Sequence, residues 1–123
     1  MTPYGLKYLT RLRVGLSHLR SHKFSHNFKD TPSKYCPDCK KSPETTEHYL
    51  LHCPTYHRIR SELFEKLKQL ISLPTLISTS YTCNLLLLGN SRYDSHTNRK
   101  ILELTVNFII NSNRFDGPLF SND

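Results

Sequence analysis

The 123-residue sequence contains no run of about eighteen apolar residues, the length that a membrane-spanning helix requires. Its first five residues, Met1 to Gly5, also lack the apolar core of a secretory signal peptide. Only 37% of the residues are hydrophobic, so the material for a buried core is limited. These absences predict a soluble intracellular protein that forms one small domain, or a fragment of one, and has no membrane partner.

The motifs of the common catalytic sites are missing as well. There is no glycine-rich phosphate loop, no serine in a nucleophile elbow and no pair of acidic residues suited to two-metal chemistry. Tyr93 and Asp94 are adjacent, but the second aspartate that a polymerase palm needs to hold magnesium does not follow them. We therefore expect no enzymatic activity and no small-molecule substrate.

Negative charge is scarce in the amino-terminal third of the chain. Residues 1–41 carry nine Lys or Arg but only two acidic residues, while the rest of the chain is balanced, so the formal net charge of +7 comes from residues 1–41. A basic segment of this kind suits phosphate backbones, and it is equally compatible with a solvated basic face. The residues expected to contact RNA or DNA are Lys7, Arg11, Arg13, Arg20, Lys23, Lys34, Lys40 and Lys41.

The chain has only four cysteines, and three of them lie close to His48 in the sequence. Cys36 and Cys39 are separated by two residues, and His48 and Cys53 follow. Three thiolates and an imidazole are ligands of tetrahedral zinc, and four protein ligands leave no open position for a substrate. The spacing therefore predicts a structural zinc ion in a knuckle, closed by a short helix over residues 45–52. Cys83 is expected to be a buried free thiol.

The identity of the fourth ligand is open from spacing alone. Residues five apart on an α-helix point about 140° away from each other, so His48 and Cys53 cannot both face a metal from one continuous α-helix. Pro54 should end that helix, because the residue before a proline is driven out of the α region, and Cys53 can then turn back. The rival ligand is His52, four residues after His48. A further alternative is that the first two cysteines are core thiols or halves of disulfides.

Apolar periodicity predicts a mainly α, small, zinc-stabilised helical domain with a carboxyl-terminal helix. The first expected helix, which Gly15 weakens or divides, has a leucine stripe formed by Leu6, Leu9, Leu12, Leu16 and Leu19. A second helix over residues 56–72, with Thr55 as its N-cap, carries a stripe of Tyr56, Ile59, Leu63, Leu67 and Leu70. A third helix, over residues 98–112, is apolar around much of its girth and should be buried or meet a partner.

Residues 1–73 are expected to hold the basic segment, the zinc knuckle and the amphipathic helix. Residues 74–123 are expected to hold a linker over 74–80, a segment at 82–88 that fits either a helix or a strand, the final helix and an irregular tail from residue 113. We expect the two parts to pack together as one domain.

Two further patterns lie in the basic segment. Phe24 and Phe28 alternate with cations and are able to stack on exposed bases, although a core role is the favoured interpretation. His18, His22 and His26 recur at four-residue steps, but no carboxylate or thiol nearby completes a second metal site, so none is expected.

A larger set of residues forms a family pattern, namely Leu12, Arg13, Gly15, Cys36, Cys39, Glu44, Thr45, Glu47, His48, Leu50, Leu51, Cys53, Pro54, Tyr56, Arg60 and Leu63. This set resembles the cysteine-histidine zinc-binding region at the carboxyl end of reverse transcriptases from non-LTR (LINE-type, jockey-like) retrotransposons. The resemblance is most specific from Cys36 to Arg60 and extends over residues 9–115. It departs from the family at Lys40, where a glycine commonly follows the second cysteine, and at Leu16, where a histidine is often seen.

The resemblance implies that Cys36, Cys39, His48 and Cys53 bind zinc, and that the region helps to grip the element RNA or the target DNA beside the remainder of a reverse transcriptase. Because the polymerase and endonuclease residues are missing, the chain is expected to be an element remnant without the RNA-directed DNA polymerase activity of its parent. An intracellular location is expected, the nucleus being favoured over the cytoplasm. Two alternatives are a protein-interaction module that docks through its apolar final helix and a non-functional fragment.

Overall fold

The computed structural model describes residues 2–15, 17, 19–26, 33–73 and 77–115, and the chain in these ranges is mainly helical. Its elements are α1 Pro3–Val14, α2 Arg20–Ser25, the π-helical turn η1 His48–His52, the 3-10 turn η2 Pro54–Tyr56, α3 His57–Leu70, α4 Thr79–Leu88 and α5 Ser95–Ser112. The described ranges contain no strand, only an isolated bridge between Tyr35 and Pro43. The predicted fold class is therefore confirmed. Outside the described residues lie Leu16, His18, Phe28, the linker residues 74–76 and the tail beyond Phe115.

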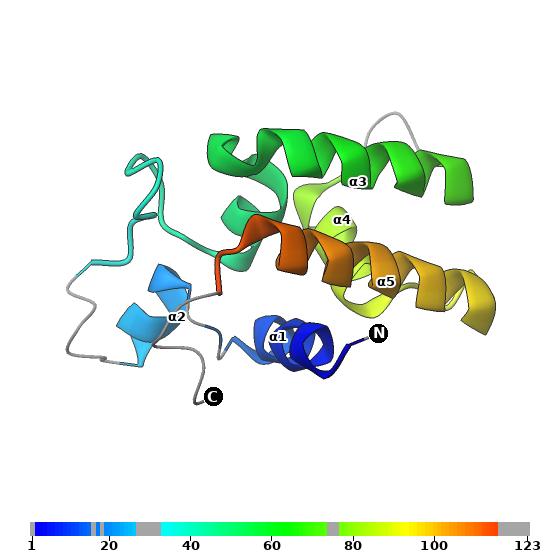
Figure 1. Cartoon of the computed structure of the whole chain (residues 1–123), viewed down its shortest axis with the longest axis horizontal. Helices are drawn as coiled ribbons and strands as arrows, with labels where there is room; N and C mark the ends of the chain where they lie inside the picture. Colours follow the sequence, from blue (N-terminus) through cyan, green and yellow to red (C-terminus); the bar gives the residue numbers. More distant parts are fainter. Residues whose placement is uncertain (1, 16, 18, 27–32, 74–76, 116–123) are drawn as a thin grey trace.

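Helix α5 is the element around which α1, α3 and α4 pack (Figure 1). Ile101, Val106, Phe108 and Ile109 form one broad side of this helix, and each is at most 2% exposed. The main apolar side of α5 is thus buried, as expected, and its cover comes from helices of the same chain, while Arg99, Lys100 and Asn107 are exposed. Docking on a partner through Ile109 would require this side chain to leave the core.

Most of the described residues of the predicted leucine stripe are buried, and on α1 they are joined by Tyr8. Leu9, Leu12 and Leu19 are buried as predicted, whereas Leu6 is 42% exposed and Tyr8 is fully buried in addition. Gly5 explains the burial of this side of α1 against α5, because a Cβ atom at this position would clash with a side-chain carbon of Val106. Only glycine permits α1 to approach α5 this closely, so the contact is centred on Gly5 and Tyr8.

Gly15 divides the amino-terminal segment, as predicted. It has a left-handed φ of 72° and ends α1, and its N–H donates to the carbonyl of Arg11. The separate helix α2 then begins at Arg20. On α2, Phe24 is 44% exposed, so the favoured interpretation of this ring as a core residue is wrong.

Helix α3 carries the predicted stripe, since Leu63 and Leu67 are buried. Its α-helical part begins only at His57, because the residues after Cys53 first form the 3-10 turn η2. The predicted N-cap at Thr55 is therefore wrong, and Tyr56 occupies the cap position without a side-chain hydrogen bond. The helix ends at Leu70 and packs mainly on α5.

Residues 82–88, which fitted either a helix or a strand from the sequence, belong to helix α4. The hydroxyl of Ser78 accepts a hydrogen bond of 3.0 Å from the N–H of Tyr81, which caps α4 and shortens the predicted linker. Gly89, with a left-handed φ of 73°, ends the helix. Helices on both sides of residue 73 pack on α5. None of the helices in the described part of the chain has the length and apolar character to cross a bilayer.

One buried ion pair joins the segment before η1 to the residues directly after α5. Both carboxylate oxygens of Glu44, a residue that is 1% exposed, accept hydrogen bonds from the guanidinium of Arg114, at 2.7 and 2.8 Å. The carboxylate also accepts a hydrogen bond of 2.7 Å from the N–H of Arg20. Glu44 thus holds α2, the segment before η1 and the residues after α5 together.

Replacing one partner should therefore be strongly destabilising. We expect Arg114→Met to lower the free energy of unfolding by about 3 kcal/mol, because it leaves a buried carboxylate without its counter-ion. The double variant Glu44→Gln/Arg114→Met should recover much of this loss, since the glutamine oxygen still accepts from the N–H of Arg20. Urea unfolding of the zinc-loaded chain measures both, and equal stability of wild type and Arg114→Met would contradict the role of the pair.

Candidate metal centre

A tight hairpin over residues 34–44 presents the first two cysteines. The N–H of Cys36 donates to the carbonyl of Ser42 at 2.8 Å, and the N–H of Glu44 donates to the carbonyl of Lys34 at 2.8 Å. At the tip, the N–H of Lys40 closes a turn on the carbonyl of Cys36 at 3.0 Å. This backbone pairing places Cys36 and Cys39 on one loop, as the spacing predicts.

Lys40 adopts the left-handed conformation, with φ at 61°. This conformation costs a residue with a Cβ atom roughly 1 kcal/mol more than it costs glycine. A glycine here would adopt this conformation without that cost. The lysine is accommodated in the turn, so the turn forms without glycine.

The second pair of ligands comes from η1, and its geometry corrects the expectation of an α-helix. The N–H of Cys53 donates to the carbonyl of His48 at 2.7 Å, which is the i to i+5 hydrogen bond of a π-helix. This wider turn brings residues five apart toward the same side, which an α-helical turn does not do. Cys53 itself is extended, as expected before Pro54. The predicted end of the helix is right, and the predicted helix type is wrong.

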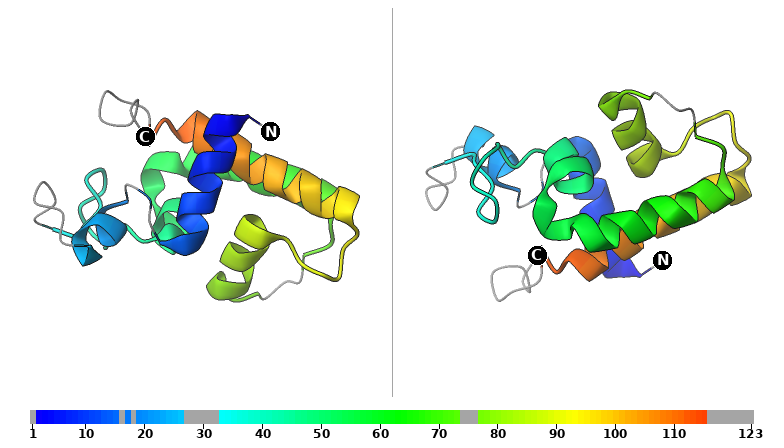
Figure 2. Two further views of the ribbon diagram at one scale, coloured as in Figure 1. Left: turned by 90° about the horizontal axis from the view of Figure 1, so that it is seen from below. Right: turned by 90° about the horizontal axis from the view of Figure 1, so that it is seen from above.

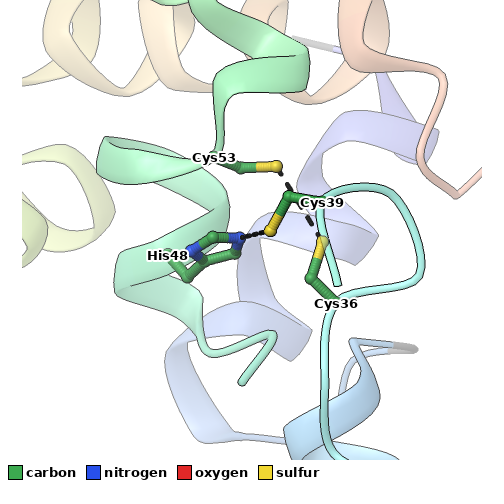
Figure 3. Close-up of side chains that lie close together, drawn as sticks. All are labelled: Cys36, Cys39, His48 and Cys53. Carbon is green, nitrogen blue, oxygen red and sulfur yellow. Dashed lines mark hydrogen bonds between the residues drawn. The ribbon is translucent and has the colours of Figure 1, made fainter. Parts of the chain in front are cut away.

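The four side chains converge on one point (Figure 3). The sulfur atoms of Cys36 and Cys53 lie 3.9 Å apart, and the Cys39 sulfur lies 3.3 Å from Nε2 of His48. All four candidate ligand atoms lie within 4.8 Å of one another. In a tetrahedral zinc site with Zn–S near 2.3 Å and Zn–N near 2.0 Å, neighbouring ligand atoms are about 3.5 to 3.8 Å apart. The arrangement is therefore compatible with a metal site.

The rival ligand His52 is exposed and is not part of this group. The four cysteines are free thiols, so the disulfide alternative is not what the structure contains. Cys83 is buried at 6% exposure on α4, in agreement with the prediction of a buried free thiol.

The local electrostatics differ between the ligands. Burial raises the pKa of the Cys36 thiol to about 11, although the backbone amides of Cys39 and Asp38 act in the opposite direction. The backbone amide of Lys41 is the main cause that lowers the pKa of Cys39. Burial lowers the pKa of His48, which keeps the imidazole neutral near pH 7 and able to donate a lone pair. The amides and a metal cation would together stabilise the thiolates.

Several contacts outside the ligands hold the site in place. The hydroxyl of Tyr56 donates to the carboxylate of Asp38, in the loop between the first two cysteines, at 3.1 Å. The guanidinium of Arg60 donates to the carbonyls of Leu50 and Tyr49, at 2.8 and 3.1 Å. These carbonyls belong to η1, so Arg60 satisfies acceptors of the turn that presents His48 and Cys53.

Sequence reasoning missed the supporting role of Glu44 and Arg114. The resemblance includes Glu44 without assigning it a partner, and nothing about the isolated Arg114 indicates a pair with a residue 70 positions away. A single acidic residue directly before the predicted helix was the available signal. It is too common at helix starts to have identified a buried pair.

A second candidate ligand group, formed by Cys36, Asp38 and Glu44, overlaps the first. Glu44 is already paired with Arg114, so the four-residue cluster is the better metal site. His22 contacts other residues, since its Nδ1 lies 2.7 Å from Oγ of Ser17 and its Nε2 lies 3.2 Å from Oγ1 of Thr46. Burial lowers the pKa of His22, in keeping with a neutral ring between two hydroxyls.

The predicted phosphate-contacting residues fall into two groups. On α1, Lys7 and Arg11 lie over the ring of Tyr8, and Arg13 donates from Nε to the carbonyl of Leu87 at the end of α4. The second group lies on α2 and on the hairpin, which are side by side at one end of the molecule in both views of Figure 2. This group, called the metal-end cations below, consists of Arg20, Lys23, Lys34, Lys40 and Lys41.

Comparison of the chain with protein-family models, with curated proteins and with solved structures found no match. The interpretation of the site therefore depends on the chain's own residues and geometry.

Cobalt substitution should identify the ligand set. With three sulfur ligands, Co²⁺ should give strong thiolate-to-metal charge-transfer absorption near the ultraviolet, and Cys53→Ser should reduce it by about one third while weakening binding. His52→Ala and Cys83→Ala are the matched controls and should leave the spectrum unchanged. A loss of absorption in His52→Ala, with Cys53→Ser unaffected, would contradict the assignment.

Metal binding should also release protons. A thiol with a pKa near 11, such as Cys36, is protonated at pH 7 and must lose its proton to bind, whereas His48 is already neutral. The affinity for zinc should therefore rise with pH, by about two to three log units per pH unit between pH 6.5 and 7.5. Calorimetric titration in two buffers of different ionisation enthalpy measures the proton count. Proton release below one per zinc would contradict binding through three thiolates.

Proposed function

We propose that this chain is a nucleic-acid-binding module built around a structural zinc ion. The donor set supports zinc, because three thiolates and one imidazole in a compact group are the ligands of structural zinc sites. Cys36, Cys39, His48 and Cys53 would fill all four coordination positions, so the ion would shape the chain rather than perform chemistry. No catalytic activity belongs to the proposal.

The observation that carries the nucleic-acid part is the position of the metal-end cations. Lys34, Lys40 and Lys41 are exposed on the hairpin whose tip the metal would clamp. Arg20 and Lys23 lie on α2, and the N–H of Ser21 in α2 donates to the carbonyl of Glu44 at 3.1 Å, beside the hairpin. Positive charge on a small, fixed surface is the arrangement that phosphate backbones bind.

The proposal also takes in the resemblance to the carboxyl-terminal zinc region of non-LTR retrotransposon reverse transcriptases. Under it, the chain is a remnant of such an element, and its partners are RNA or DNA and the remainder of a reverse transcriptase. The left-handed Lys40 supports the comparison, since it occupies the position where those sequences commonly have glycine. The burial of Ile101, Phe108 and Ile109 of α5 within the chain gives the competing idea of docking through that helix no support.

A salt titration tests the proposal. If six phosphates are neutralised, the logarithm of affinity should fall against the logarithm of salt concentration with a slope of about −5 on duplex DNA and about −4 on single strands. The triple variant Lys34→Gln/Lys40→Gly/Lys41→Gln should make the duplex slope shallower by about 3. Glycine at position 40 keeps the left-handed turn while removing the charge. Filter binding with the zinc-loaded chain provides the measurement.

The matched control removes three exposed lysines elsewhere, Lys66→Gln/Lys68→Gln/Lys100→Gln on α3 and α5, and has the same net charge as the test variant. It should retain most of the slope. Equal effects of the two triple variants would mean that the slope depends on the net charge of the chain, and they would contradict a specific role of the metal-end cations. An affinity independent of salt would overturn the proposed function.

A further inference from the structure

Two aromatic rings are exposed among the metal-end cations. Tyr35, on the first arm of the hairpin, is 50% exposed, and Phe24, on α2, is 44% exposed. Single exposed apolar residues are ordinary on protein surfaces, so exposure alone carries no argument. Two further observations carry the argument. They are the hydrogen-bonded backbone that holds Tyr35 and the positive charges around its side chain.

The hairpin fixes the direction of Tyr35. Its neighbour Cys36 points into the metal cluster and is 1% exposed. Adjacent side chains along an extended arm point to opposite sides, so Tyr35 faces away from the cluster. The bridge to Pro43 and the hydrogen bonds on either side of it hold this arm. The ring is thus presented on a backbone that the metal would stiffen further.

The surrounding charges favour a polyanion. Lys34 adjoins Tyr35, and Lys40 and Lys41 lie at the tip of the same hairpin. The two acidic side chains of the hairpin region are engaged elsewhere, since Asp38 accepts from Tyr56 and Glu44 is paired with Arg114. A ring flanked by cations, with its nearby carboxylates occupied, offers both a stacking surface and phosphate contacts.

From this geometry we infer that the preferred ligand is single-stranded nucleic acid, with bases stacked on Tyr35 and Phe24 and phosphates on the metal-end cations. The inference rests on the proposed function and adds the strand state of its ligand. Every unpaired base has an exposed face for such stacking, whereas the bases of a duplex are already stacked on one another. In the described part of the chain, no hydrogen bond from its hydroxyl ties the Tyr35 side chain to another residue, so no such bond has to break when a base stacks on its ring.

The test compares a fluorescein-labelled oligo(dT) of twenty nucleotides with a duplex of twenty base pairs, using the zinc-loaded full chain. Loss of one stacked base should weaken single-strand binding by about 5- to 150-fold, so we expect this loss in Tyr35→Ala and in Phe24→Ala. Duplex affinity and the salt slope should stay within twofold, because no charge is removed. Tyr35→Phe, which keeps the ring, should bind single strands like the wild type.

Two further variants sharpen the readout. Leu88→Ala removes a side chain that is 61% exposed on α4 and should bind both probes unchanged. The chain contains no tryptophan, so Tyr35→Trp introduces a unique fluorophore whose emission should be quenched by oligo(dT) but not by the duplex. An unchanged Co²⁺ spectrum confirms that each variant keeps the fold of the hairpin.

The outcomes separate the inference from the function on which it rests. Equal binding of both probes, with Tyr35→Ala behaving like the wild type, overturns the stacking inference and leaves nucleic-acid binding standing. A loss of single-strand affinity in Tyr35→Phe equal to that in Tyr35→Ala also overturns it. Failure of the wild type to bind either probe at low salt overturns the proposed function and the inference together.

Discussion

The convergence of three sulfur atoms and one imidazole nitrogen is the constraint on which the metal end of the molecule depends. Two of the sulfurs are buried 3.9 Å apart, and burial raises the pKa of Cys36, so ionisation of this thiol calls for a cation beside it. Both backbone segments that supply ligands depart from the commonest geometry. Lys40 is left-handed in the turn that carries Cys36 and Cys39, and His48 begins the π-turn that leads to Cys53.

The imidazole is positioned by the helical body rather than by the hairpin. Tyr49 follows His48, and its ring packs edge-on against Phe108 of α5 at a centroid distance of 5.3 Å. Its hydroxyl lies 2.6 Å from the hydroxyl of Ser112, at the end of the same helix. Because Tyr49 is fully buried, the turn that presents His48 is fixed by the core. Half of the ligand set is thus held in place by contacts that need no metal, which lowers the ordering cost of binding.

The parts of the structure that the sequence could predict are those with a local signal. The stripe of α3 and the all-round apolar α5 follow from periodicity, and the ligand types follow from the spacing of Cys36 and Cys39. The π-turn at His48 has no such signal, since it differs from an α-turn by one hydrogen bond. The exposure of Leu6 and the burial of Tyr8 on α1 were not predicted, because Gly5 contributes by its missing side chain, which a count of leucines ignores. The pair of Glu44 and Arg114 depends on a contact across the fold, which periodicity does not contain.

The charges inside the metal end are balanced internally, which bears on what its surface can do. Three thiolates around a divalent ion would leave a net charge of roughly −1. The guanidinium of Arg60 lies close enough to interact electrostatically with Cys53. Arg114 neutralises Glu44 in the same region. In the described ranges no ion pair holds Lys34, Lys40 or Lys41. The buried groups of the metal end therefore do not neutralise the positive charge of the hairpin. That charge faces solvent on a backbone that the underlying contacts hold in place.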